Sequence, residues 1–132
     1  MKASVTWQQD LCFEAKTDTG KTIVMDGNSE GKALSPMESI LLAVGGCSSI
    51  DVVDILSKSR QDISDCHCEL SAQRADDAPR VFTAIHAHYT VKGPKVSEKH
   101  LARAVQLSAE KYCSVMLMLQ SKVNITTSYA LI

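Results

Sequence analysis

Five cysteines offer the strongest chemistry in this chain of 132 residues, and two of them lie in segments with helical spacing. Cys47 follows the pair Gly45 and Gly46 in the apolar segment SPMESILLAVGGCSSIDVVDILSKSR, residues 35–60. Cys113 lies in the second segment, EKYCSVMLML. A thiolate is a nucleophile and a metal ligand, whereas a buried thiol also packs as a small hydrophobe. Residue types alone leave both roles open for Cys47 and Cys113.

Cys66 and Cys68, together with His86 and His88, supply the ligand types of a zinc site on two neighbouring predicted strands. Side chains alternate between the two faces of a sheet. The cysteines alternate in phase with apolar residues and should face inward, whereas the histidines should face outward. Donors on opposite faces cannot close one tetrahedral site, so we predict core thiols, solvated histidines and no metal. A looser outward cluster of His67, His86 and His88 is the alternative.

The composition limits the classes of partner. Apolar residues make up 45% and charged residues 22%, the net charge is −1, and no basic patch indicates nucleic-acid binding. The amino-terminal MKASVTWQQD has no apolar signal-peptide core, and no segment reaches the roughly 18 unbroken apolar residues of a membrane span. We therefore expect a cytoplasmic protein with no nucleic-acid or membrane partner. The odd number of cysteines then indicates thiols, and Cys12, without a motif around it, should be structural.

The elements that must position these cysteines follow from the apolar pattern. Residues 3–9, 11–18 and 21–27 predict three short strands, and the polar run 26–32 predicts a loop. Ser35, Pro36 and Glu38 then form the start signal of a helix, with a capping box between the serine and the glutamate. We expect this helix to end near Lys58.

The remaining pattern predicts two strands, a helical region and a last strand. The strands span roughly 64–74 and 80–92, and the helical region runs from 97 to 123, either unbroken or interrupted near Glu110. Residues 124–132 close the chain as a strand. The inward set of strand 80–92 is predicted to be Val81, Thr83, Ile85, Ala87, Tyr89 and Val91, with Phe82 in the outward set. This order is α+β, with mostly antiparallel sheet and two long helices in a single domain, residues 1–132.

The first predicted helix is apolar on most sides and needs cover on most sides. One chain offers a single further helical region and about six short strands to cover it. A second copy of the chain would complete the cover, and Gly45 with Gly46 would let another backbone approach closely. We predict a homodimer; the alternative is that the two sheets of one chain suffice.

Two blocks of the sequence resemble the OsmC/Ohr family, the osmotically inducible and organic hydroperoxide resistance proteins. The blocks are SPMESILLAVGGCSSIDVVDIL and EKYCSVMLMLQSKVNI, and the resemblance covers nearly the whole chain. A closer resemblance, to the YhfA-like subgroup, is carried by DGNSEGKALSPMESILLAVGGCSSIDVVDIL, APRVFTAIHAHYTV and ARAVQLSAEKYCSVMLML. The family implies an OsmC-like fold, an intertwined homodimer with sheets wrapped around two central helices and an active site at the subunit interface.

The resemblance also implies an activity, the thiol-dependent reduction of organic hydroperoxides. Cys47 matches the peroxidatic cysteine of the family and Cys113 matches its resolving cysteine. The Cys47 thiolate would attack the O–O bond, the resulting sulfenic acid would condense with Cys113, and an external dithiol would reduce the disulfide. The expected partners are a peroxide and a dithiol reductant, with no metal or organic cofactor.

The chain departs from the family pattern in its charged groups. Active members pair an arginine from before the first long helix with a glutamate ten residues before the peroxidatic cysteine. Here that position is Met37, and no arginine precedes Arg60. Glu38 lies about 100° further round the helix, and its capping-box role with Ser35 accounts for it. The candidates for the missing positive charge are three lysines before the helix, Lys16, Lys21 and Lys32, and three arginines that could reach in from a second subunit, Arg74, Arg80 and Arg103. Lys32 lies closest in sequence to the helix start, and Lys32 and Glu38 are the predicted supporting residues.

This departure keeps two further functions open. A non-catalytic protein on the same scaffold would bind a small apolar ligand in an interfacial pocket near Met37, Met116 and Met118, although such methionines also serve as core filler. A redox-sensing dimer would use the Cys47–Cys113 disulfide to alter a partner without catalytic turnover.

Overall fold

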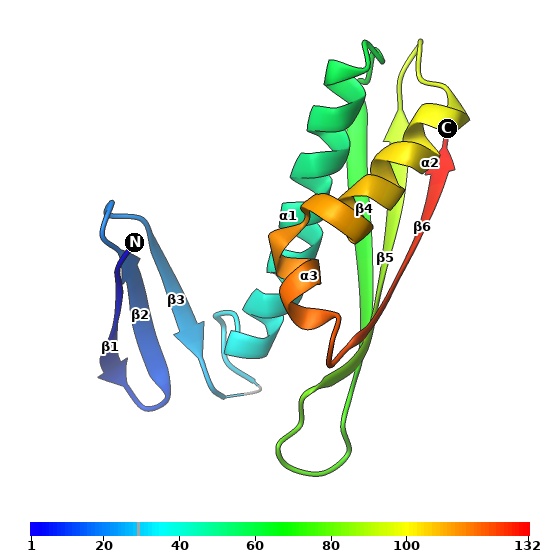
Figure 1. Ribbon diagram of the computed structural model, residues 1–132. Coiled ribbons are helices and arrows are strands. Elements are labelled where there is room, and N and C mark those ends of the chain that lie inside the picture. Colours follow the sequence, from blue (N-terminus) through cyan, green and yellow to red (C-terminus); the bar gives the residue numbers. More distant parts are fainter. Residues whose placement is uncertain (29) are drawn as a thin grey trace. The chain divides into compact units, whose positions relative to one another are not determined.

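The computed structural model describes residues 1–28 and 30–132, and this part of the chain has the predicted α+β composition (Figure 1). The elements are β1 (Ala3–Gln9), β2 (Cys12–Thr17), β3 (Thr22–Asp26), α1 (Pro36–Lys58), β4 (Asp65–Arg74), β5 (Phe82–Lys92), α2 (Glu98–Leu107), the π-helical η1 (Ser108–Tyr112), α3 (Ser114–Leu119) and β6 (Asn124–Leu131). The chain divides into two compact units, Met1–Ile40 and Leu41–Ile132, with the boundary inside α1. The single-domain expectation stays a prediction.

The first unit contains an antiparallel sheet in the order β1-β2-β3. All seven residues of β1 are exposed, including Val5 and Trp7. The predicted loop 26–32 includes residue 29, which lies outside the described residues. Within the described part of this loop, the backbone N–H of Asn28 donates to the Asp26 carboxylate (2.8 Å).

The helix α1 begins with the predicted capping box. The backbone N–H of Glu38 donates to Ser35 Oγ (3.1 Å), and the backbone N–H of Ser35 donates to Glu38 Oε1 (3.0 Å). These bonds satisfy two backbone donors that the helix itself leaves free. At the other end, Lys58 pairs with Asp54 one turn earlier (2.6 Å). The sequence signals therefore located both ends of the helix that carries Cys47.

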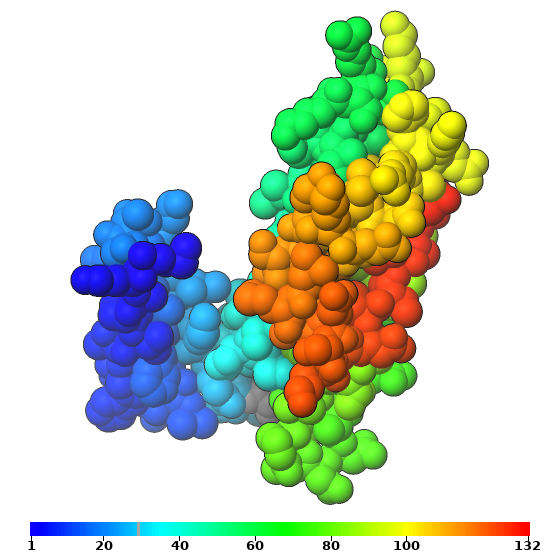
Figure 2. Space-filling view, viewed as in Figure 1, coloured from blue at the N-terminus to red at the C-terminus, as the bar shows by residue number. Residues whose placement is uncertain are grey.

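The second unit has a sheet in the order β4-β5-β6, with α1 and the helical segment 98–119 on one of its faces (Figure 1). Strands β4 and β5 are antiparallel, whereas β5 and β6 are parallel. A parallel pair needs a crossover connection, and α2, η1 and α3 supply it. Figure 2 shows this segment, in yellow and orange, packed against the cyan and green of α1.

Apolar side chains from the sheet and the helices form the core of this unit. They include Val44, Val52 and Leu56 of α1, Ile85, Ala87, Tyr89 and Val91 of β5, and Leu101, Ala104 and Val105 of α2. The glycine at position 45 is buried, and a Cβ there would lie 2.5 Å from Leu70 Cδ1. Gly45 therefore permits close packing of α1 on β4 within one chain. A Cβ at Gly46 would meet no described atom within 4 Å.

The predicted alternation of the fifth strand is wrong at its beginning. Phe82 is 7% exposed and belongs to the core, whereas Val81 is 51% exposed and Thr83 is also on the surface. The strand pairing shifts register between Gln73 and Arg74 of β4. An extra residue in one strand reverses the phase of the side chains beyond it. From Ile85 onward the predicted inward positions are correct.

The second helical region is broken rather than continuous. It consists of α2, the five-residue π-helix η1 and the short helix α3, and Cys113 lies between the last two in an extended conformation (φ −69°, ψ 101°). The sequence left this choice open and placed any break near Glu110, which lies within η1. Short π-helical turns occur frequently at functional sites.

Candidate functional site

The helix α1 presents Cys47 and Asp51 on one face. The two residues are four apart, which places their side chains one turn from each other. Both are partly buried. Cys47 therefore has a carboxylate as its neighbour on the helix, a pairing that follows directly from the sequence spacing.

The break in the second helical region positions Cys113. Its backbone N–H donates to the Ser108 carbonyl (2.8 Å), which closes the π-helical turn, and its Sγ accepts the backbone N–H of Met116 (3.4 Å) at the start of α3. The side chain is fully buried. Because Cys113 is outside both helices, its thiol acts as the cap of α3 and is held in one place.

These elements bring three reactive side chains together. The Sγ atoms of Cys47 and Cys113 and a carboxylate oxygen of Asp51 all lie within 4.8 Å of one another. Both cysteines are free thiols. The two sulfur atoms come from distant parts of the sequence, so the cluster depends on the packing of α1 against the η1–α3 junction.

The surroundings favour the protonated form of the buried thiol. Burial raises the pKa of the Cys113 thiol to about 11, and the neighbouring Cys47 and Asp51 act in the same direction, whereas the N–H of Met116 lowers it. Thiolate is the nucleophilic form of cysteine. At neutral pH Cys113 is therefore a thiol and a weak nucleophile.

A hydrogen-bond network lies directly behind the cluster. Ser108 Oγ donates to Asp51 Oδ2 (3.0 Å), and the Tyr89 hydroxyl donates to Ser48 Oγ (2.6 Å). Ser48 Oγ in turn donates to the Val44 carbonyl (2.7 Å). The two bonds of Ser48 are buried and therefore protected from competition with water, whereas the Ser108–Asp51 bond is part-buried. They fix α1 against β5 and η1 at the level of the cysteine pair.

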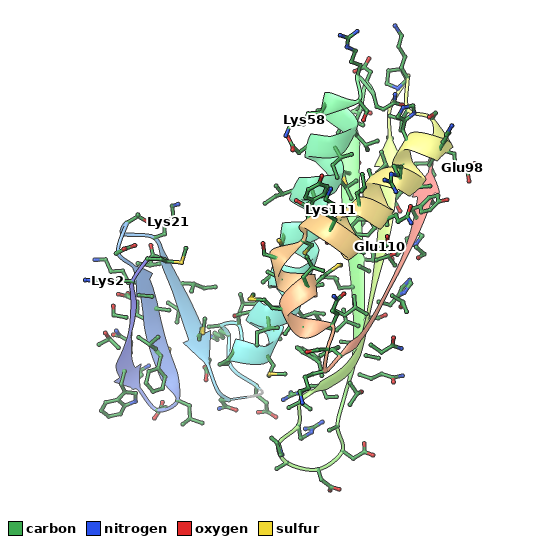
Figure 3. The ribbon with its side chains drawn as sticks, viewed as in Figure 1. Lys2, Lys21, Lys58, Glu98, Glu110 and Lys111 are labelled. Atoms are coloured by element: carbon green, nitrogen blue, oxygen red, sulfur yellow. The ribbon has the colours of Figure 1, made fainter. Side chains whose placement is uncertain are left out.

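An open cleft of about 460 Å³ adjoins the cluster at Asp51. Its walls include Ile55 and Lys58 of α1, Leu107 of α2 and the partly exposed Tyr112 of η1. Lys58 and Lys111, labelled in Figure 3, come from α1 and η1, and the Lys111 ammonium lies 5.3 Å from the centre of the Tyr112 ring. A small molecule in this cleft would contact the carboxylate that neighbours Cys47.

The two predicted supporting residues belong to the other compact unit, Met1–Ile40. The Glu38 carboxylate accepts the backbone N–H of Ser35, as the capping box requires. Lys32 is exposed on the wall of a pocket that also includes Asp26 and Glu30. Their roles in catalysis stay predictions.

The histidines lie on the outer face of the sheet β4-β5-β6. His86 is hydrogen-bonded to Thr126 (2.6 Å) and Ser128 (2.8 Å), and His88 is hydrogen-bonded to Ser128 (2.7 Å). His67 lies 3.8 Å from Glu69. The inward cysteines of β4 are thus on the opposite face, which agrees with the sequence argument against a shared zinc site.

Sequence reasoning did not single out Asp51 or Ser108 as site residues. The signal for Asp51 was available, because four-residue spacing from Cys47 puts it on the same helical face. Ser108 had no comparable signal: its contact with Asp51 spans 57 residues and depends on the π-helical turn.

The features above define a class of protein, an α+β chain in which a long helix and a helix break hold two free thiols side by side. The family model described as OsmC-like protein matches residues 29–128, and the chain belongs to that family. Protein YhfA of Escherichia coli strain K12 is 53% identical over 132 residues, which is 100% of this chain and 98% of that protein.

Solved structures agree with this membership. A hypothetical protein from Aquifex aeolicus VF5 is 35% identical, with a TM-score of 0.90 over 99% of this chain and 95% of that chain. An organic hydroperoxide resistance protein OsmC from Legionella pneumophila has a TM-score of 0.73 over 98% of this chain and 95% of that chain. At 13% identity, the Legionella structure shows a shared fold only.

Proposed function

We propose that this protein is a thiol-dependent peroxidase that reduces organic hydroperoxides through Cys47 and Cys113. The observation that carries the proposal is the approach of the two free thiols to within 4.8 Å. The chain belongs to the OsmC-like family, and a neighbour of the same fold is named an organic hydroperoxide resistance protein, which is the source of the proposed substrate class. Cys47 is the more accessible of the two thiols and is assigned the first step.

The reaction has three steps. The Cys47 thiolate attacks the terminal oxygen of ROOH, the O–O bond breaks, and an alcohol leaves with a proton from solvent. Cys113 sulfur then attacks the sulfenic acid on Cys47, an S–S bond forms, and water leaves. An external dithiol reduces this disulfide by exchange and is itself oxidised, which restores both thiols. A disulfide needs Cα atoms within about 7 Å and has an S–S bond of about 2.05 Å, so the two sulfurs must approach each other before the bond forms.

The proposal is tested by peroxide consumption with a dithiol reductant. Wild-type protein should consume cumene hydroperoxide, and Cys47→Ser should reduce the rate to the uncatalysed level. Cys113→Ser should instead accumulate a sulfenic acid on Cys47, which a dimedone reagent traps and mass spectrometry locates. Wild-type protein that consumes no peroxide with any dithiol would refute the proposal.

We further propose that the working form is a homodimer. Leu42, Ile50 and Val53 form an exposed apolar stripe along α1, and Ile50 is 71% exposed. Gly46 lies on the same stripe and leaves room for a close partner. By length and composition α1 also resembles a membrane span, but the core helices of soluble proteins have the same length and composition.

The dimer is tested by light scattering after size exclusion. Wild-type protein should have the mass of two chains, and Ile50→Glu should shift it to one chain, because a buried carboxylate without a partner is costly. A wild-type monomer without detergent would refute the dimer.

A redox-sensing dimer is the second candidate, favoured by one observation. Because the pKa of Cys113 is raised, resolution of a sulfenic acid should be slow at neutral pH. A sensor would form the disulfide once per oxidation event and would not turn over. Stopped-flow measurement of disulfide formation against steady-state turnover separates the two functions, since a sensor oxidises fully but shows no sustained peroxide consumption.

A further inference from the structure

We propose that the reduced protein binds one Zn²⁺ per chain through Cys47, Cys113 and Asp51. The three donor atoms, two sulfurs and one carboxylate oxygen, already lie within 4.8 Å of one another. The inference adds a metal-bound resting state to the thiol chemistry proposed above, but it depends only on the positions of the three side chains.

The donor set suits zinc better than other common cations. Thiolates are soft ligands that select zinc over magnesium or calcium, and a carboxylate is an accepted third ligand. Three protein ligands with an open fourth position are the usual arrangement of a reactive zinc site. Water would occupy the fourth position, because the cleft adjoins the cluster at Asp51.

The three donor atoms need to move only slightly closer to one another to bind zinc. Zinc–sulfur bonds of about 2.3 Å and zinc–oxygen bonds of about 2.0 Å place tetrahedral donors roughly 3.5–3.8 Å apart. The separations of up to 4.8 Å must therefore shorten by about 1.0–1.3 Å at most. Cys47 and Asp51 are partly exposed on one helix face and have room to rotate, while the buried Cys113 stays fixed.

Hydrogen bonds already hold two of the three donor groups. Ser108 Oγ donates to Asp51 Oδ2 (3.0 Å), which orients the carboxylate, and the Met116 N–H donates to Cys113 Sγ (3.4 Å), which stabilises a thiolate. Outer partners of this kind commonly change metal affinity by about 10–100-fold. The cluster thus has both its ligands and the groups that hold two of them.

Zinc would also compensate the negative charge of the three donor groups, whose atoms lie within 4.8 Å of one another. On binding, each thiol gives its proton to solvent, and the metal compensates two thiolates and one carboxylate. Both sulfurs are used, so the metal and the Cys47–Cys113 disulfide exclude each other. The metal would hold the pair in its reduced form.

The test is an anaerobic titration of the reduced, full-length protein with Co²⁺, followed by competition with Zn²⁺ and a chromogenic chelator. One Co²⁺ should bind per chain with a thiolate-to-metal charge-transfer band, and Zn²⁺ should displace it. Cys47→Ser and Cys113→Ser should each lose at least half of that band, and Ser108→Ala should weaken binding about 10–100-fold. Asp51→Asn should weaken it more than Ser108→Ala.

The matched control is the double variant Cys66→Ser, Cys68→Ser, which should keep the full band. Should a variant fail to fold, wild-type protein gives the same answer, because Zn²⁺ should slow alkylation of Cys47 and leave that of Cys66 and Cys68 unchanged. A band that keeps its full intensity in Cys47→Ser, or that disappears in the control, overturns the inference. Peroxide consumption without zinc binding would refute this inference alone, and zinc binding without peroxide consumption would refute the proposed function alone.

Discussion

The chain contains two pairs of neighbouring cysteines, and they differ in how they are built. Cys66 and Cys68 are two residues apart on β4 and share its inward face. Cys47 and Cys113 come from the helix α1 and from the junction of η1 with α3. The strand pair is close because of the sequence, whereas the helix pair is close because of the fold.

The two cysteine pairs also differ in their chemical surroundings. Burial is the first cause that raises the pKa of both Cys66 and Cys68, so each is a weak nucleophile at neutral pH. The helix pair also has a burial-raised thiol, Cys113, but it adds a carboxylate within 4.8 Å and an adjoining cleft. The proposed reactive pair therefore differs from the strand pair in its neighbouring carboxylate and cleft, both of which depend on the convergence of different elements.

The largest expected effect separates the two pairs directly. Cys47→Ser should lower peroxide consumption to the uncatalysed rate, because the attacking sulfur is removed. The double variant Cys66→Ser, Cys68→Ser should stay within about twofold of wild type in the same assay. Equal losses in both variants would remove the distinction between the pairs.

The hydrogen bond behind Cys47 should have the next largest effect. Ser48→Ala leaves the buried Tyr89 hydroxyl without its partner at 2.6 Å and should lower the free energy of unfolding by about 1–3 kcal/mol. Tyr89→Phe keeps the bond from Ser48 to the Val44 carbonyl and should cost less, about 0.5–1.5 kcal/mol. Urea denaturation of the two variants measures both values. The reverse order would mean that the phenol finds another partner.

Substitution of Gly45 and Gly46 in α1 tests how closely this helix packs on β4, the strand that carries Cys66 and Cys68. A Cβ at Gly45 would lie 2.5 Å from Leu70 Cδ1, so overpacking should make the free energy of unfolding of Gly45→Ala about 1–2 kcal/mol lower than that of Gly46→Ala, which has the same gain in helix propensity.

Gly46→Ala is the matched control, since its Cβ meets no described atom within 4 Å. In a monomer it should raise the free energy of unfolding by about 1 kcal/mol, the usual gain in helix propensity. In the proposed dimer it should weaken association instead. Chemical denaturation at two protein concentrations distinguishes these results, and a Gly45→Ala variant as stable as a monomeric Gly46→Ala variant would show that Leu70 moves aside freely.

Local sequence signals predicted much of this architecture. The capping box at Ser35 and Glu38 and the Lys58 end of α1 are satisfied within a few residues, so the pattern located them correctly. The strands were found for the same reason, but the phase of Phe82 was wrong because a bulge depends on the partner strand. Local sequence signals predict helices and strands well, but they predict the register between paired strands poorly.

The candidate site likewise has a part that local sequence spacing predicts and a part that depends on long-range contacts. Cys47 and Asp51 share a helical face, which sequence spacing alone reveals, but the role of Asp51 appears only when Ser108 and Cys113 are beside it. The π-helical turn that places Cys113 has no sequence signal that we used. The pairing of the two thiols was predicted from a family resemblance, since 65 intervening residues offer no physical reason for it.

The smallest expected effect concerns the start of the helix that carries Cys47, and it depends on pH. The backbone N–H of Ser35 and then its hydroxyl hold the pKa of Glu38 below its ordinary value of 4.5. The folded protein therefore favours the carboxylate more than the unfolded chain does, and this contribution to stability is complete above about pH 4.5. It is lost as the pH falls through the folded-state pKa.

Glu38→Gln should remove that dependence, while Glu30→Gln, in the same unit, serves as the control. Thermal unfolding of the three proteins between pH 3 and 7 measures it: the difference between wild type and Glu38→Gln should shrink on acidification. A constant difference across that range would mean that Glu38 acts at the helix start through its size and hydrogen bonds rather than its charge.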